Sequence, residues 1–150
     1  MAQNRFRSTS THMLDEKGRL NLPIRFREVL RQSGADLLMV VPWKDHLRAY
    51  RLPEWEALET KLLTEGAAHG VKKIARYALS LVVECPVDKQ GRIRISPELR
   101  ATAKLDKDIA LRGMSDWFEI WDKDASQADF DEILENFDEL SAGLDSLGIL

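Results

Sequence analysis

The sequence predicts an α+β fold, mostly β, built from two tandem copies of one small unit with short helices. The first observation is a repeated motif: Asp15-Glu16-Lys17-Gly18-Arg19 returns 73 residues later as Asp88-Lys89-Gln90-Gly91-Arg92. The second is the alternation of apolar residues after each Arg, with one more before each Asp, which is typical of half-buried strands. The third is a proline soon after each copy, Pro23 and Pro97, where a short helix can begin.

Each motif is predicted to be a strand, a tight basic turn and a second strand. Asp at the first position of a turn and Gly at its end suit a type I turn closed by a left-handed residue. After the first hairpin, Pro23 begins a helix over 24–31, because its missing N–H would be unsatisfied at that position anyway. Strands over 37–41 and 47–52 follow, and Pro53 opens a second helix.

The second half repeats this order after a linker at Gly66-Ala67-Ala68-His69-Gly70 and a basic segment over 72–76. Ser96 and Pro97 are the expected N-cap and first residue of the short helix, since Ser caps helices well. The predicted elements are a strand over 80–87, the second hairpin, the short helix, and strands over 109–113 and 117–121.

The last segment, 122–150, differs from both halves. It carries nine acidic residues and one Lys, a net charge of −8, whereas residues 1–121 have a net charge of +5. Apolar residues spaced by three and four predict an acidic amphipathic helix, too short for a free coiled coil and expected to pack on the body or a neighbour. These residues are Phe130, Ile133, Phe137, Leu140, Leu144 and Leu147. The charge asymmetry favours polyanion binding by the basic part.

Composition argues against several other classes. The single cysteine, Cys85, excludes an intrachain disulfide and a multi-cysteine zinc site, and it is expected to be a buried apolar residue. No signal peptide is recognisable, and the longest strongly apolar run, 37–41, is too short to span a bilayer. We therefore expect a cytoplasmic protein without membrane contact.

Catalytic patterns are scarce as well. No phosphate-binding loop, zinc-protease or nucleophile-elbow motif occurs, and His12, His46 and His69 lack metal-ligand spacing. Asp15 and Asp88 could form a carboxylate pair, but an ion pair with the Arg four residues on, holding each turn, is the simpler account. The sequence predicts no enzyme, no cofactor, no metal and no small-molecule substrate.

The cations of the two hairpins point to binding instead. Lys17 with Arg19, and Lys89 with Arg92 and Arg94, lie on or near exposed turns. Arginine bonds bidentately to phosphate oxygens or to a guanine edge. One such turn could equally be a solvated polar tip, but two copies favour contact with the repeated phosphates of a duplex.

These residues carry a resemblance to the MraZ family of bacterial transcriptional regulators, which contain two tandem SpoVT/AbrB swapped-hairpin β-barrel domains. The sequence departs from the family pattern at two places: extra residues precede Phe6, and Ser96 stands where the family often has a first proline. The acidic tail lies outside the resemblance. The matching stretches cover about residues 6–125 and are Asp15–Leu20 with Pro23–Glu28, Tyr50–Trp55, Asp88–Arg92 with Pro97–Arg100, and Phe118–Asp122.

The resemblance implies a ring-shaped homo-oligomer that binds direct repeats of double-stranded DNA in its own promoter, in the nucleoid and without a cofactor. It implies a repressor or modulator of a division and cell-wall gene cluster, with repression the expected role. Carried over by position, the DNA-facing residues are Lys17, Arg19, Lys89 and Arg92. Arg5, Arg7, Arg25 and Arg94 join them because they are basic and nearby, and Asp15, Gly18, Asp88 and Gly91 are expected to brace the turns.

The expected domains are residues 6–53 and 80–123, a helical linker over 54–79 and an acidic tail over 124–150. The alternative function is an antitoxin-like interaction module that dimerises through this fold and holds a basic partner with its acidic tail. Two full domains favour the DNA-binding regulator, because antitoxins of this type usually have one.

Overall fold

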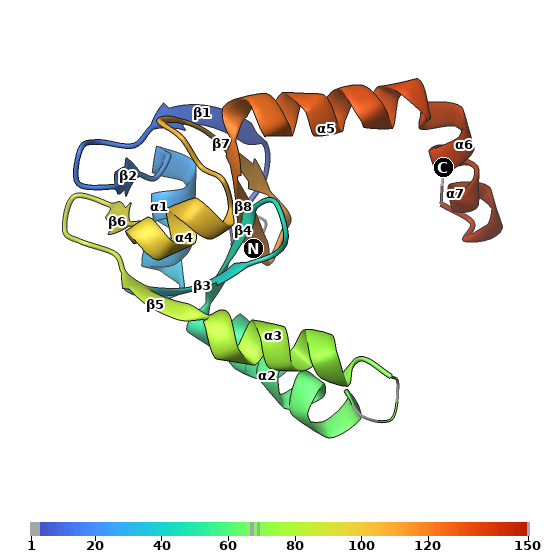
Figure 1. The fold of residues 1–150 in the computed structure, drawn as a ribbon, viewed down its shortest axis with the longest axis horizontal. Helices are drawn as coiled ribbons and strands as arrows, with labels where there is room; N and C mark the ends of the chain where they lie inside the picture. Colours follow the sequence, from blue (N-terminus) through green and yellow to red (C-terminus); the bar gives the residue numbers. More distant parts are fainter. Residues whose placement is uncertain (1–3, 67, 69, 150) are drawn as a thin grey trace.

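The computed structural model of the protein describes residues 4–66, 68 and 70–149 (Figure 1). Ala67 and His69 of the predicted linker lie outside the described residues. The strands are β1 (Thr9–Met13), β2 (Arg19–Asn21), β3 (Leu37–Pro42), β4 (Leu47–Arg51), β5 (Val83–Pro86), β6 (Arg92–Arg94), β7 (Asp108–Gly113) and β8 (Trp117–Asp122). The helices are α1 (Ile24–Gln32), α2 (Leu52–Glu65), α3 (Lys72–Leu81), α4 (Pro97–Thr102), α5 (Lys123–Glu135), α6 (Phe137–Ser141) and α7 (Gly143–Ser146).

The strands of the two halves are interleaved. Six strands form one antiparallel sheet in the order β1-β7-β8-β4-β3-β5, and β2 pairs with β6 in a separate two-stranded ribbon. Strand β1 of the first half therefore pairs with β7 of the second, and β5 of the second half pairs with β3 of the first. The mostly β, swapped-hairpin prediction is confirmed. The closed barrel is wrong, because β2 and β6 pair with each other and leave β1 and β5 as the edges of the larger sheet.

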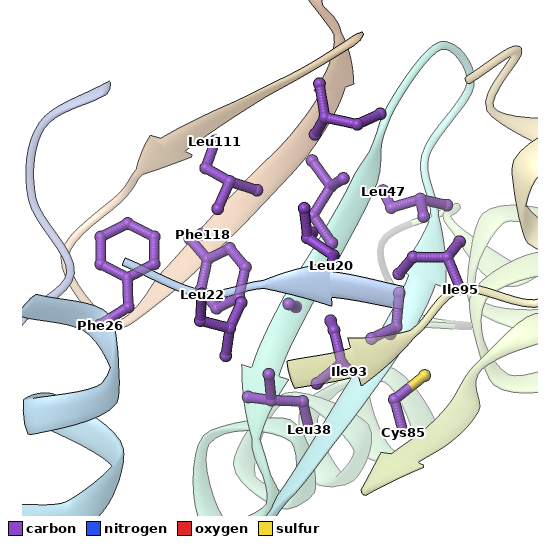
Figure 2. Close-up of a cluster of buried hydrophobic side chains, with 14 of the residues drawn as sticks. Leu20, Leu22, Phe26, Leu38, Leu47, Cys85, Ile93, Ile95, Leu111 and Phe118 are labelled. Carbon is purple, nitrogen blue, oxygen red and sulfur yellow. The ribbon is translucent and has the colours of Figure 1, made fainter. Parts of the chain in front are cut away.

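The main core lies between the six-stranded sheet on one side and the ribbon with α1 and α4 on the other (Figure 2). Leu20 of β2 and Ile93 of β6 point into this core and are almost completely buried. Three aromatic rings from separate parts of the chain, Phe6, Phe26 and Phe118, pack within 4.9–5.1 Å of one another between ring centroids. The core thus holds both halves together. Cys85 is buried in it, and burial raises the pKa of its thiol to about 11.

The helices α2 and α3 form a hairpin over the opposite face of β3 and β4. Because strand residues alternate, Leu38 and Val40 enter the main core while Met39 and Val41 join a second cluster with Trp55 of α2. Residues 80 and 81, which were expected to begin a strand, instead end α3. Short apolar runs are ambiguous between helix and strand, and here packing on α2 decides.

The acidic tail is helical but broken into three pieces rather than one helix. The carboxylate of Asp122 caps α5 by accepting the Ala125 N–H at 3.1 Å. The first turns lie on the sheet, where the guanidinium of Arg112 sits 3.9 Å from the centre of the Phe130 ring. The chain then extends away from the body and bends after α5, at Asn136 (Figure 1). Among the described residues, no helix has the length and apolar character needed to cross a membrane.

Removing the central aromatic ring tests whether this core carries the stability. Phe118→Ala is expected to lower the free energy of unfolding by about 3–5 kcal/mol, because it leaves a cavity where Phe6 and Phe26 meet. Urea denaturation followed by circular dichroism measures this. Ile24→Ala, at an apolar side chain that is 70% exposed, is the control and should change stability by less than about 0.5 kcal/mol. Equal losses in the two variants would contradict the assignment of the core.

Candidate nucleic-acid interface

The first turn is built around the carboxylate of Asp15. Its Oδ1 accepts the backbone N–H of Lys17 at 2.9 Å and that of Arg19 at 2.8 Å. Its Oδ2 accepts the side-chain Nε–H of Arg19 at 2.6 Å. Asp side chains commonly bond backbone groups two residues on, which is why Asp suits this position. One carboxylate therefore shapes the turn and fixes the arginine beside it.

The second turn repeats this arrangement. Oδ1 of Asp88 accepts the backbone N–H groups of Gln90 and Arg92, both at 2.9 Å, and Oδ2 accepts Nε–H of Arg92 at 2.8 Å. The structure thus contains the Asp–Arg ion pair that the spacing predicts, in both copies.

Hydrogen bonding holds the pKa of each of these carboxyls below its usual range. The largest cause is the backbone N–H of the arginine, followed among the lowering causes by its side chain, for Asp15 with Arg19 and for Asp88 with Arg92. Both carboxylates are exposed to solvent. They are therefore charged at neutral pH while they brace the turns.

Each turn is closed by the opposite half of the chain. The carbonyl oxygen of Gly18 accepts the Ile95 N–H at 2.8 Å, and that of Gly91 accepts the Leu22 N–H at 3.0 Å. Both glycines have positive φ, +77° and +75°. A Cβ at Gly18 would lie 2.7 Å from the Ile95 carbonyl oxygen, and one at Gly91 would meet the side chain of Arg27. Glycine is required at both positions for conformation and for space.

These bonds place β2 and β6 side by side as an antiparallel ribbon (Figure 1). Arg19 pairs with Arg94, Leu20 with Ile93, and Asn21 with Arg92. Since Leu20 and Ile93 face the core, their neighbours on both strands face outward. We call the residues Arg19, Asn21, Arg92 and Arg94 the ribbon face. The turns carrying Lys17 and Lys89 lie at its two ends, because the strands run antiparallel.

The two halves of the ribbon face are not identical. With the 73-residue offset, Arg19 corresponds to Arg92, but Asn21 corresponds to Arg94. Lys17 is the third residue of its motif and Lys89 the second, so Glu16 occupies the place of Lys89 in the first turn. The second hairpin is the more cationic of the two.

The remaining predicted cations are located elsewhere. Arg5, Arg7 and Arg25 line a separate groove of about 400 Å³ together with apolar and polar residues of α1, and neither turn contributes to it. Arg5 also lies 3.6 Å from the carboxylate of Asp116. The structure therefore joins Arg94 to the ribbon face and leaves these three outside it.

Sequence reasoning missed three residues of this region. Asn21 lies on the ribbon face, opposite Arg92. Arg27 and Arg100 are another pair at the same 73-residue offset, and each packs against the glycine of the opposite turn. The Nε–H of Arg27 donates to the Leu22 carbonyl at 3.1 Å. Extending the repeat beyond the motif would have identified this pair. Within the described residues, no cluster of ligand side chains could hold a metal ion.

Duplicated hairpins that close each other's turns define a tandem swapped-hairpin protein. The chain belongs to the MraZ family, whose profile, described as "MraZ protein, putative antitoxin-like", matches residues 5–75 and 79–145. This match confirms the resemblance seen in the motifs.

Proteins named "Transcriptional regulator MraZ" are similar to the chain over most of its length. The protein from Desulforapulum autotrophicum is 44% identical over 119 residues, covering 79% of this chain and 81% of its own. The protein from Pelotomaculum thermopropionicum is 39% identical over 147 residues, with 93% and 99% covered. That from Limosilactobacillus fermentum is 35% identical over 143 residues, with 95% and 98% covered.

Acid titration tests the carboxylates of the turns. The pKa of each Asp is lowered in the folded protein. The stabilisation of the fold by each charged carboxylate is therefore complete at a pH above the ordinary pKa of about 3.9. It is lost as pH falls through the lower folded value. The double variant Asp15→Asn/Asp88→Asn should be less stable than wild type at pH 7, and the difference should shrink at pH 3. Thermal unfolding measures both, with Glu56→Gln as control. A difference independent of pH would contradict the role given to the carboxylates.

The turn glycines can be tested with a matched pair. Gly18→Ala should lower the free energy of unfolding by more than about 1–2 kcal/mol, the cost of a left-handed alanine alone, because the methyl group also meets the Ile95 carbonyl. Gly34→Ala is the control, since Gly34 has a φ of +66° but no atom within 4 Å of the added methyl. Chemical denaturation should show the larger loss at Gly18. Equal losses of stability in the two variants would mean that the backbone at Ile95 does not pack tightly against the turn at Gly18.

Proposed function

We propose that the protein is a sequence-specific, DNA-binding transcriptional regulator whose ribbon face enters the major groove. The observation that carries the proposal is the outward row of three arginines and one asparagine on a two-stranded antiparallel ribbon. The names of the similar proteins support the regulatory role. The fold alone would not, because folds host many functions.

The geometry suits base reading. The major groove of B-DNA admits a two-stranded β-ribbon, and arginine pairs bidentately with guanine while asparagine pairs with adenine. In this proposal Arg94 and Asn21 contact base edges, and Lys17 and Lys89 hold phosphates at the two ends of the ribbon. Phosphate contacts position the protein and base contacts give specificity.

The ion pairs prepare two of the arginines for binding. The aspartate accepts the Nε–H of Arg19 in one turn and of Arg92 in the other, and this is one of the five N–H groups of a guanidinium. Holding such a flexible side chain in place before binding reduces the entropy that binding would cost. The aspartates thus act as positioning residues, and the arginines meet DNA.

The finer part of the proposal follows the family. A ring-shaped homo-oligomer presents several ribbon faces to direct repeats in the promoter of its own division and cell-wall gene cluster and represses transcription there. Each contact is weak and salt-dependent, and linkage of several contacts supplies the affinity. The protein then acts in the cytoplasm at the nucleoid, as a binding protein and not as an enzyme.

Gel shifts test this function. They compare binding to the DNA upstream of the gene with binding to a scrambled duplex, over a series of salt concentrations. Arg94→Ala should reduce preference for the upstream DNA, because one base contact contributes about 1–3 kcal/mol of discrimination. Lys89→Ala should weaken binding to both duplexes and reduce the log–log salt slope by about one.

Lys61→Ala, on α2, is the matched control and should bind like wild type. Unchanged preference in Arg94→Ala and Arg19→Ala, with the oligomer intact, would reject the ribbon face as the reading surface. Equal binding of both duplexes by the wild type would reject sequence-specific recognition.

A further inference from the structure

The acidic tail presents an uncovered apolar surface. Beyond Phe130, which is held by Arg112, the side chains of Leu134, Phe137 and Leu140 are 68%, 53% and 60% exposed. Residues 131–149 contain six acidic residues and no Lys or Arg. We call residues 131–149 the acidic arm. Large apolar side chains exposed together on neighbouring helices indicate a surface that a partner covers.

The helical hairpin α2–α3 carries a surface of complementary character. A groove of about 330 Å³ runs between the two helices, with the apolar residues Leu62, Leu63 and Leu79 and the bases Lys72 and Arg76 along it. Residues 66–83 contain three Lys or Arg and no acid. We call this the basic groove. Leu63 is 69% exposed, whereas Leu62 and Leu79 are half-buried, so part of the apolar lining of the groove is uncovered.

The arm and the groove match in spacing and in charge. Phe137 and Leu140 lie three residues apart within α6, the i, i+3 spacing by which a helix lays apolar side chains into a groove. Glu135, Asp138 and Glu139 of the arm would then lie near Lys72 and Arg76. Complementary charge favours this pairing and opposes the pairing of two acidic arms.

Within one chain, the acidic arm and the basic groove lie in different parts of the molecule. In Figure 1 the arm, coloured orange and red, and the α2–α3 hairpin, coloured green, extend from opposite parts of the β body. We propose that the acidic arm of one copy docks into the basic groove of α2–α3 of a second copy. Such a contact joins unlike surfaces head to tail, and repetition of it closes a ring when the rotation allows.

This inference deepens the ring of the proposed function and involves none of the residues of the ribbon face. Assembly can therefore be measured without DNA. A wild type that assembles through the arm but binds no DNA would reject the proposed regulator and leave this inference standing. Specific DNA binding by a protein whose assembly ignores the arm would do the reverse.

Sedimentation velocity of the full chain tests the contact with two variants. Phe137→Ser/Leu140→Ser removes apolar contacts of the arm, and Lys72→Glu/Arg76→Glu reverses the charge of the groove. Each double variant should raise the concentration at which the oligomer dissociates by at least about tenfold. For the wild type, the same dissociation concentration should rise with salt, because salt screens the attraction between the arm and the groove. Lys61→Glu makes the same charge reversal on α2, outside the lining of the groove, and should leave the oligomer unchanged.

Mixing the two variants gives the sharpest result. One retains an arm and the other a groove, so the mixture should form a one-to-one pair and nothing larger, while each variant alone remains a monomer. Circular dichroism and thermal unfolding confirm that both variants are folded. If the groove variant alone still forms oligomers, the arms contact each other. If both variants form the same oligomer as the wild type, the arm binds another partner. Either result would overturn the proposal.

Discussion

The hydrogen bonds from Ile95 to Gly18 and from Leu22 to Gly91 are the constraint on which the rest of the structure depends. Each turn is completed by backbone of the other half, so neither hairpin has its final form until both are present. The same bonds set the register of β2 and β6 and so decide which side chains face outward. Glycine is needed there because a side chain would push the two halves apart.

The two faces of the six-stranded sheet have different roles, because successive residues of each strand face opposite sides. On one face, residues such as Leu38, Leu111 and Phe118 fill the shared core beneath the ribbon. The opposite face carries the two projecting elements, with α2–α3 over β3 and β4 and the start of α5 over β7 and β8. Arg112 on β7 shows how the second contact is held, since it pairs with Asp129 at 2.8 Å and lies over Phe130.

Much of this could be predicted from the sequence, because the duplicated motif encodes a local structure. Asp15, Gly18 and their copies specify a turn by short-range chemistry alone, and the strands around them follow from alternation. The pairing of β2 with β6 across 73 residues could not be predicted, since no local pattern tells a strand which partner it takes. The same holds for Asn21, whose place beside the arginines comes only from register. The end of α3 was missed because its short apolar run suits either structure.

The unequal halves of the ribbon face have one more consequence. Residue 21 corresponds to Arg94. If it were also an arginine, a half-turn rotation would exchange equivalent residues of β2 and β6, and the ribbon face would look the same from both ends of a bound duplex. With asparagine at one end and arginine at the other, that equivalence is lost. If the ribbon face binds DNA as proposed, each subunit has a forward and a reverse orientation on the double helix, and successive subunits that share one orientation would select sites that run in the same direction.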